Sequence, residues 1–398
     1  MQEPFIKPLS ILATLHENGY EAYFVGGAVR DLLLNRPIGD IDIATSALPE
    51  EVMSLFPRTV DVGIEHGTVI VLIENIPYEV TTFRIEEEYE DYRRPSSVSF
   101  IKSLTEDLKR RDFTMNAIAM DGLGRMIDPF NGKEAIKNGV IETVGNPNER
   151  FYEDALRMMR GIRFVSQLNF SLSALTEEAI KTNGYLLRKI SVERLTKEFE
   201  KIILAHNTSE GLSLLVKTNI FKYLPNLSVY RDALNEMHLF RWNLLKDKSE
   251  AWSLFLVLLN ISDIKGFLKD WKLPNKLIVS IDKNVKGLRK VQENGWSVEI
   301  LYELGFDHSR QVETIRSILS SEDVENNINK IKQQYLLLPI KTRNDLVISG
   351  NDLLLWSDRE PGPWVSKSLS EIENYVLRNE LQNDEAKIKE WFFRCNRK

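Results

Sequence analysis

Two closely spaced carboxylates, Asp40 and Asp42, follow a pair of adjacent glycines, Gly26 and Gly27. Alternation along a strand would place both carboxylates on one face and the neighbouring isoleucines on the other. Adjacent glycines let the backbone approach a ligand closely, and a following helix directs free N–H groups at it. Such groups suit a divalent metal ion and a nucleoside triphosphate. The alternative is a plain turn followed by a polar strand face.

The surrounding sequence predicts the elements that would hold these groups in place. An apolar run at residues 22–25 predicts a strand before the glycines, and residues 29–34 predict a short helix. Two more strand patterns, at residues 66–73 and 78–84, are joined by a short turn. Glu79 in the second pattern could complete a trio of carboxylates and help activate an attacking hydroxyl. A solvent-facing strand glutamate is the alternative.

Residues 109–117 mix basic side chains, which suit phosphate, with polar ones that suit hydroxyl groups. Arg111 is of the first kind, and Asp112 and Asn116 are of the second. Before them, residues 85–97 are polar and lack a clear period, which predicts a mobile loop.

Residues 153–164 predict a helix on which Asp154, Arg157 and Arg160 share one face. Cytosine and adenine both present an amine donor beside a ring-nitrogen acceptor, whereas guanine and uracil present an oxygen in place of the amine. A carboxylate accepting from the amine and a guanidinium donating to the ring nitrogen would therefore hold C or A and oppose G and U. Asp154 and Arg157 would then act as a templating base. A surface row of ion pairs is the alternative.

Composition places the chain among ordinary soluble proteins. It has 398 residues, of which 43% are hydrophobic and 28% charged, and it contains no apolar run long enough to span a membrane. Residues 1–9 do not resemble a signal peptide, and the single cysteine, Cys395, fits a reducing cytoplasm. The net charge of −6 argues weakly against a nucleic-acid partner, unless positive charge is segregated to one face. Arg194, Lys197 and Lys201 form a basic line that could grip RNA, or a solvated helix face.

The sequence changes character near residues 145–148. Glycines and strand patterns become rare after this point, and helical periodicity continues almost to the C-terminus. The pattern predicts an α+β fold whose strands lie in residues 1–146. Helical segments follow at residues 147–206, 207–300 and 301–398.

These stretches together resemble the bacterial class II tRNA nucleotidyltransferases, the CCA-adding enzymes of the polymerase-beta-like superfamily. The resemblance runs through Gly-Gly-Ala-Val-Arg-Asp at 26–31, Asp-Ile-Asp at 40–42, Arg-Arg-Asp-Phe-Thr-Met-Asn-Ala at 110–117, Glu-Asp-x-x-Arg at 153–157 and Ser-Val-Glu-Arg at 191–194. Pro-Gly-Pro-Trp at 361–364 is similar to the Bacillus-like subgroup, which lacks a His-Asp phosphohydrolase domain. Ala155 departs from the pattern, where proline is expected.

The resemblance implies a nucleotidyltransferase head with a small mixed sheet at residues 1–146, a base-recognising neck, a helical body and a tRNA-binding tail. It implies that Asp40 and Asp42 hold Mg²⁺, with two ions expected, and that Glu79 is the third catalytic carboxylate. The implied nucleotide-binding residues are Gly26, Gly27, Arg30, Arg111, Asp112 and Asn116 around the triphosphate and sugar, Asp154 and Arg157 at the base, and Arg160 and Arg163 in support.

The implied activity is template-independent addition and repair of the 3′-terminal CCA of tRNA from CTP and ATP, with release of pyrophosphate. The expected partners are the tRNA acceptor end and the two nucleotides, in the cytoplasm and away from any membrane; a homodimer is compatible with the sequence. We expect the loop from Glu86 to Arg94 to serve the switch from C to A addition. The alternatives are an A-adding or CC-adding enzyme, a poly(A) polymerase, and a non-catalytic RNA-binding helical module.

Overall fold

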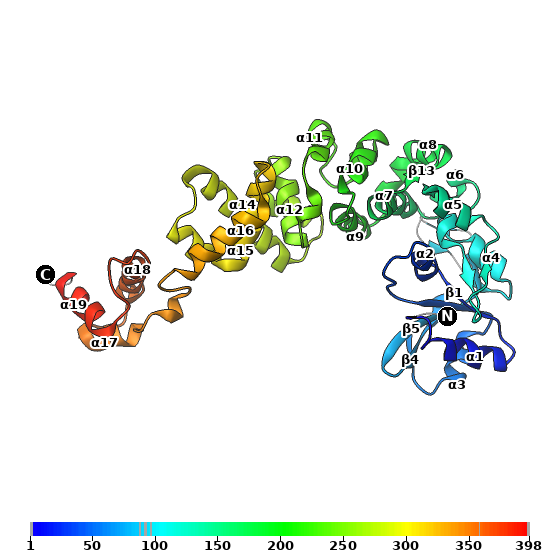
Figure 1. Ribbon diagram of the computed structural model, residues 1–398, viewed down its shortest axis with the longest axis horizontal. Helices are drawn as coiled ribbons and strands as arrows, with labels where there is room; N and C mark the ends of the chain where they lie inside the picture. The colour runs from blue at the N-terminus through cyan, green and yellow to red at the C-terminus, as the bar shows by residue number, and fades with distance from the viewer. Residues whose placement is uncertain (1–2, 87–88, 91–93, 96–97, 358, 396–398) are drawn as a thin grey trace. The chain divides into compact units, whose positions relative to one another are not determined.

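The computed structural model describes residues 3–86, 89–90, 94–95, 98–357 and 359–395 (Figure 1). The chain divides into two compact units, Met1–His238 and Leu239–Lys398. The change of character near residues 145–148 therefore lies inside the first unit, and the division into four segments stays a prediction. Within the described ranges, no helix has both the length and the apolar character that a membrane span requires.

The first unit is built on a mixed sheet. Among the described residues its strands follow the order β11-β10-β1-β2-β5-β4-β3. β2 runs parallel to β5, and the other neighbouring pairs are antiparallel. The strands are β1 (Ala22–Val25), β2 (Asp42–Thr45), β3 (Thr59–Gly63), β4 (Thr68–Ile73), β5 (Ile76–Thr82), β10 (Ala119–Met120) and β11 (Met126–Ile127). The predicted mixed sheet is confirmed.

The polar segment after β5 contains short strand pairs where the sequence predicts a loop. β6 (Arg84–Glu86) pairs with β9 (Val98–Phe100), and β7 (Tyr89–Glu90) pairs with β8 (Arg94–Pro95). Residues 87–88 and 91–93 of the loop from Glu86 to Arg94 lie outside the described residues. Its role in substrate switching stays a prediction.

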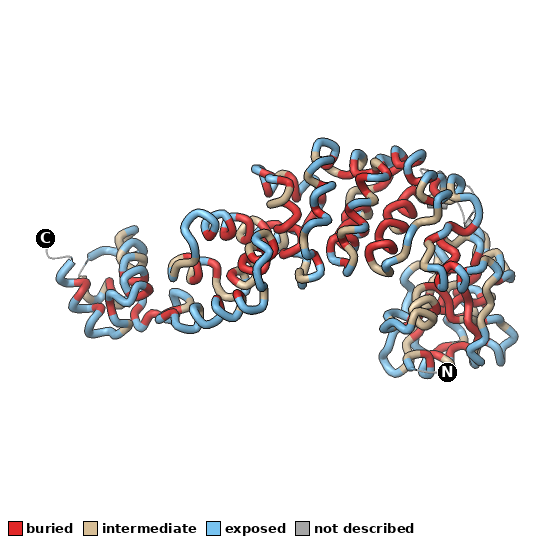
Figure 2. Tube along the Cα trace, turned by 45° about the horizontal axis from the view of Figure 1, so that its top comes forward, coloured by how far each residue is buried: buried red, intermediate tan, exposed pale blue. Residues whose placement is uncertain are grey.

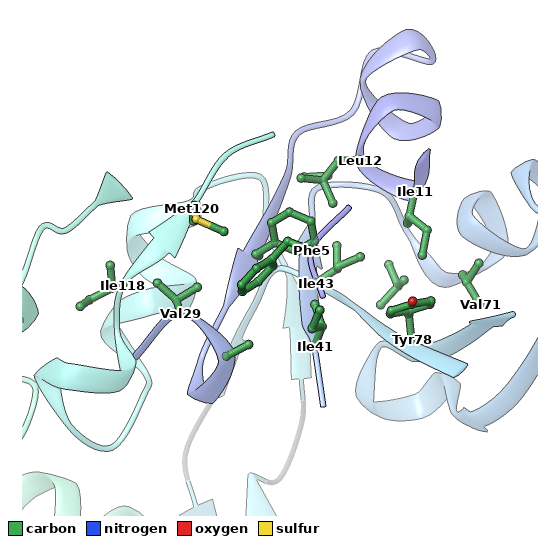
Figure 3. Packing of buried hydrophobic residues seen from close by; sticks show 14 of the residues in the cluster. Phe5, Ile11, Leu12, Val29, Ile41, Ile43, Val71, Tyr78, Ile118 and Met120 are labelled. Carbon is green, nitrogen blue, oxygen red and sulfur yellow. The ribbon is translucent and has the colours of Figure 1, made fainter. Parts of the chain in front are cut away.

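Both faces of the sheet are covered by apolar residues. Ile41 and Ile43 point into the larger cluster together with Phe5, Ile11 and Leu12 (Figure 3). Ala44 and Val25 lie in a smaller cluster on the opposite side. The isoleucine face therefore meets a core, as the alternation predicts. β2 begins only at Asp42, so Asp40 precedes the strand, and its placement within the strand is corrected.

Helices of the first unit cover the sheet and continue beyond it. α1 and α2 pack against β1, α3 packs against β4, and α7 packs against α9 and α10. The helices are α1 (Leu9–Glu17), α2 (Gly27–Leu33), α3 (Pro49–Leu55), α4 (Leu104–Lys109), α5 (Gly132–Asn138), α6 (Pro147–Glu153), α7 (Leu156–Leu168), α8 (Ala174–Asn183), α9 (Val192–Ile203), α10 (Thr208–Lys217) and α11 (Arg231–Glu236). A small parallel pair, β12 (Val140–Ile141) with β13 (Ser171–Leu172), joins the segments before α6 and after α7.

The helix predicted over residues 153–164 is interrupted at Asp154. α6 ends at Glu153 and α7 begins at Leu156, because Asp154 takes the extended backbone angles φ −137° and ψ 103°. The Asp154 Oδ1 accepts a hydrogen bond from the Leu156 N–H at 3.0 Å, the kind of local bond with which aspartate caps a helix. A continuous helix was therefore the wrong expectation, whereas its buried side at Leu156, Met159 and Phe164 is confirmed.

Among its described residues, the second unit contains helices and connecting segments but no strand. Its helices are α12 (Lys248–Leu258), α13 (Ile264–Asp270), α14 (Asn275–Asn294), α15 (Val298–Leu319), α16 (Val324–Leu336), α17 (Gly350–Ser357), α18 (Pro363–Leu377) and α19 (Glu385–Cys395). α15 bends at Gly305, whose φ of 70° is not helical. Figure 2 shows buried residues along the inner sides of these helices, as amphipathic helices require.

Candidate active site

A cavity of about 880 Å³ in the first unit gathers almost all of the predicted site residues. The predicted residues that line it are Gly26, Gly27, Arg30, Asp40, Asp42, Arg111, Asp112, Asn116, Asp154, Arg157, Arg160 and Arg163. Glu79 is not among the lining residues. Segments more than one hundred residues apart in the sequence thus meet around one space.

The lining also contains residues to which the sequence analysis gave no place in the site. They are His66, Arg84, Arg110, Leu156, Phe164, Gln167, Arg194 and Lys201. Together the lining carries nine Arg and Lys side chains against four Asp, although the whole chain has a net charge of −6. Positive charge is therefore segregated to this cavity, which suits a polyanionic ligand.

Asp42 lies where three acidic side chains come close. It is in register with Val25 of β1 on one side and with Glu79 of β5 on the other. Burial raises the pKa of Asp42 to about 6; the charges of Glu79 and Asp40 add to the rise, and that of Arg111 opposes it. A half-buried carboxylate with acidic neighbours is stabilised by a nearby cation.

This donor set fits a divalent metal ion. Magnesium in proteins is commonly held by one or two carboxylates, with water and substrate phosphates completing its coordination. Asp40 is exposed and Asp42 is half-buried, so oxygen atoms of both can face the cavity. In the described part of the chain, no group of three or more His, Cys, Asp or Glu side chains is arranged to hold a metal ion. Asp40 and Asp42 are the residues that would hold such an ion, and phosphates of a bound nucleotide would complete its coordination.

Gly26 is required between Asp42 and Arg111. Its φ is 73°, a value that side chains other than glycine rarely adopt. A Cβ atom at this position would lie 3.3 Å from Arg111 Nη1 and 3.4 Å from Asp42 Oδ2. The aspartate and the guanidinium therefore approach the backbone more closely than a side chain at residue 26 would comfortably allow.

Asp112 connects a row of polar groups across the cavity wall. Its Oδ2 accepts hydrogen bonds from Arg160, with N···O distances of 2.7 Å from Nε and 2.6 Å from Nη2. Its Oδ1 accepts from Asn116 Nδ2 at 3.1 Å, and Asn116 Oδ1 accepts from Arg30 Nη1 at 2.8 Å. Burial opposes ionisation, but Arg160 and Asn116 outweigh it and lower the pKa of Asp112 to about 2. The carboxylate is therefore charged and orients two arginines.

The ring of Phe164 is surrounded by guanidinium groups. Those of Arg163, Arg30 and Arg160 lie 4.3, 5.2 and 5.7 Å from its centroid. Arg163 also pairs with Glu198 at 2.8 Å, and both side chains are buried. The sequence indicated Phe164 only as part of a buried helix side, because cation–π partners from other elements leave no periodic signal.

Asp154 and Arg157 line the same cavity, and each has a charged partner. Asp154 Oδ2 accepts from Arg194 Nη2 of α9 at 2.8 Å. Arg157 Nη1 donates to Glu153 Oε2 at 2.5 Å, and its Nη2 donates to the carbonyl of Arg110 at 2.9 Å. The two side chains that would read a base are therefore held by residues of three different segments.

Three family models match separate parts of the chain. Residues 22–142 match the family described as Poly A polymerase head domain, and residues 169–230 match the probable RNA and SrmB-binding site of polymerase A. Residues 244–392 match the family described as putative tRNA nucleotidyltransferase domain 2.

Full-length relatives agree with these matches. The chain is 53% identical over 397 residues to a CCA-adding enzyme of Geobacillus sp. (strain WCH70), covering 100% of this chain and 98% of the relative. It is 49% identical to a CCA-adding enzyme of Bacillus mycoides, with 99% of each chain covered. The crystal structure of the Bacillus stearothermophilus CCA-adding enzyme in complex with CTP is 44% identical, covers 100% of this chain and 98% of that one, and superposes with a TM-score of 0.95.

The matching stretches include the glycine pair, the aspartate pair and the arginine-rich wall of the cavity, which are the parts from which the site was built. With this identity over its whole length, the chain belongs to the CCA-adding enzymes, a family of tRNA nucleotidyltransferases.

Proposed function

We propose that this chain adds and repairs the 3′-terminal CCA of tRNA, using CTP and ATP and releasing pyrophosphate. The observation that carries the proposal is the single cavity in which Asp40 and Asp42 face nine basic side chains and the Asp154–Arg157 segment. Such a cavity provides oxygen ligands for a metal, positive charge for a triphosphate, and a donor and acceptor for a base.

In the proposed reaction the 3′-hydroxyl of tRNA attacks the α-phosphate of the bound nucleotide, and pyrophosphate leaves. Asp40 and Asp42 would hold Mg²⁺, with two ions expected, and the bound metal supplies Lewis-acid activation and charge neutralisation. Gly26 and Gly27 let the nucleotide approach the backbone, while Arg30 and Arg111 bind its phosphates and sugar. Glu79 is the proposed third carboxylate, placed in register beside Asp42.

Base selection is proposed to rest on Asp154 and Arg157. Asp154 accepts a hydrogen bond from the exocyclic amine of C or A, and Arg157 donates one to the ring nitrogen. Asp112 and Asn116 hold the arginines of the cavity wall and reach the sugar hydroxyl groups. Arg160 and Arg163 support the pocket and contact the ring of Phe164.

Enzymes that add only part of the CCA end share the motifs of the nucleotidyltransferase head, so a product assay is needed to exclude them. An A-adding enzyme, a CC-adding enzyme and a poly(A) polymerase would differ in the nucleotides added, and a non-catalytic RNA-binding module would add none. The test is sequencing of products from tRNA that lacks its 3′ end, with CTP and ATP supplied separately and together. We expect CC from CTP alone, and CCA from both. Long A tracts, or addition of A to tRNA ending in CC without any addition of C to tRNA that lacks its 3′ end, would contradict the proposal.

The proposed place of action is the cytoplasm, where tRNA and both nucleotides are present. The proposed oligomeric state is a homodimer. The mass of the chain is 46.0 kDa, so light scattering distinguishes a monomer from a dimer of twice that mass. A single species of monomeric mass at working concentration would remove the dimer from the proposal.

A further inference from the structure

A buried carboxylate outside the predicted site holds two arginines of the cavity. Asp107 lies in α4, and 1% of its surface is exposed. Its Oδ1 accepts from Arg110, with N···O distances of 2.9 Å from Nε and 2.8 Å from Nη2. Its Oδ2 accepts from Arg111 Nη2 at 3.3 Å. Burial opposes ionisation, but Arg110 and Arg111 keep the pKa of Asp107 below its usual range, so the group is charged.

The two oxygens have different surroundings. Arg110 holds Oδ1 with two nitrogens, and the backbone N–H of Arg84 also approaches that oxygen at 3.4 Å. These contacts fix the carboxylate and turn Oδ2 toward Arg111. Among the described residues, Asp107 is the hydrogen-bond partner of the Arg111 side chain, whose Nε is buried without a partner. The direction of Arg111 is thus set largely by one oxygen atom.

The other end of the Arg111 guanidinium lies on the side of Asp42, one of the two aspartates proposed to bind metal. A Cβ atom on Gly26 would lie 3.3 Å from Arg111 Nη1 and 3.4 Å from Asp42 Oδ2, so both atoms border the space above Gly26. The side chain therefore spans from a buried anchor to the place where a triphosphate would lie. A guanidinium held at one end loses less conformational freedom when it binds phosphate with the other.

We propose that Asp107 is a positioning residue, which holds Arg111 in the orientation that binds the triphosphate and thereby sets nucleotide affinity without regard to the base. This inference rests on the proposed function for the identity of the ligand. The proposed role of Asp107 differs from that of Asp154. Asp107 acts on the binding of phosphates and sugar, which CTP and ATP share, whereas Asp154 acts on the base, which differs between them. Loss of Asp107 should therefore weaken the binding of CTP and of ATP by the same factor.

The test measures dissociation constants of CTP and ATP with the full chain in the absence of tRNA, by calorimetry. Asp107→Asn should raise both constants about tenfold or more, since a charge-assisted bond to Arg111 is lost. Asp121→Asn is the matched control, because Asp121 is also a largely buried carboxylate paired with an arginine, Arg125, but lies outside the cavity lining. It should bind both nucleotides like the unchanged protein. Unchanged constants in Asp107→Asn would overturn the inference.

A double variant separates positioning from general damage. If Asp107 acts through Arg111, Asp107→Asn should add less than about a twofold loss once Arg111→Met is present. If the affinity losses of the two single variants multiplied in the double variant, the inference would be overturned. Should Asp107→Asn fail to fold by circular dichroism, Asp107→Glu replaces it; it keeps the charge but moves it by one methylene, and both constants should still rise several-fold together.

Failure of the inference and failure of the proposed function give different results. Binding of CTP and ATP that depends on Asp107, in a protein that does not extend tRNA, would contradict the function and support the inference. Extension of tRNA by the unchanged protein, with nucleotide binding insensitive to Asp107, would support the function and overturn the inference.

Discussion

Asp154 accepts a hydrogen bond from Arg194 at 2.8 Å, across forty residues of sequence. Its other oxygen accepts from the backbone N–H of Leu156 at 3.0 Å, so both oxygens of the carboxylate are held in place. Each carboxylate oxygen has a further lone pair, and one can accept from the amine of a base without breaking either bond. A rigid acceptor discriminates more strongly than a mobile one, because it cannot turn away from a base that presents oxygen.

Replacing Asp154 by alanine should relax base selection. The variant should incorporate GMP or UMP measurably, because the acceptor that opposes the oxygen atoms of guanine and uracil is gone. It should use CTP and ATP less well, because their amines lose a hydrogen-bond acceptor. The measurement is incorporation from each of the four nucleotides at matched metal and tRNA. Glu149→Ala, which removes an acid from the first turn of α6, is the control and should keep the original preference. An Asp154→Ala enzyme as strict as its parent would place selection elsewhere.

Replacing Gly26 by alanine should lower activity as well as stability. The new Cβ would lie 3.3 Å from Arg111 Nη1 and 3.4 Å from Asp42 Oδ2, so these side chains would have to move by a few tenths of an ångström. Misplacement of site groups is costly, about a hundredfold in rate for a displacement of about 1 Å, so a smaller but measurable loss of activity is expected. Gly124→Ala is a close control, since its φ is 83° and nothing lies within 4 Å of the new Cβ. Both variants place a side chain at positive φ and should lose on the order of 1–3 kcal/mol of unfolding free energy, and only Gly26→Ala should lose activity. Equal activity in the two variants would contradict the geometry.

Asp112 should contribute to stability only while it is ionised. Its pKa in the folded protein is lowered to about 2, so its contribution is present above the unfolded value near 3.8 and is lost as the pH falls through about 2. The shift corresponds to free energy on the order of 2 kcal/mol. Urea unfolding from pH 5 to pH 2 measures it, and Asp112→Asn should flatten the decline. Parallel plots of unfolding free energy against pH for the two proteins would show that Asp112 does not supply this pH-dependent stability.

Metal binding at Asp42 should depend on pH near neutrality. In the metal-free protein the pKa of Asp42 is raised to about 6, so protons compete with a cation below that pH. The affinity for Mn²⁺, followed by electron paramagnetic resonance, should fall about tenfold per pH unit below pH 6. Asp42→Asn should bind weakly and show little of this dependence. Equal Mn²⁺ affinity at pH 5 and pH 7 in the unchanged protein would contradict the assignment.

The sequence was sufficient for residues whose role follows from local pattern. Alternation identified the buried face of Ile41 and Ile43, and the glycine pair marked the turn before α2. Asp154 shows the limit of periodicity: its side chain bonds the backbone N–H of Leu156, and the helix is interrupted there although the apolar spacing continues. Asp107 pairs with Arg110 and Arg111 at spacings of three and four residues, a local helical pattern that can be recognised in the sequence.

Contacts between distant segments could not be predicted from local sequence pattern. The pairing of Asp112 with Arg160 joins positions 48 residues apart, and Arg163 with Glu198 joins positions 35 apart. Neither pair has a periodic signature, because each depends on how α7 packs against the head and α9. Lys201 was one member of a basic line with two interpretations, and only packing places it at the cavity.

The most direct test of the account is the rate of CMP incorporation into tRNA lacking its CCA end by Asp42→Asn, with Mg²⁺ present. Asparagine keeps the size of the side chain and removes its charge, so the rate should fall by about three orders of magnitude or more while the protein stays folded. Asp61→Asn, on the edge strand β3 of the same sheet, should react like the unchanged protein. An Asp42→Asn enzyme that incorporates CMP at a near-normal rate would contradict the metal-dependent mechanism proposed for this site.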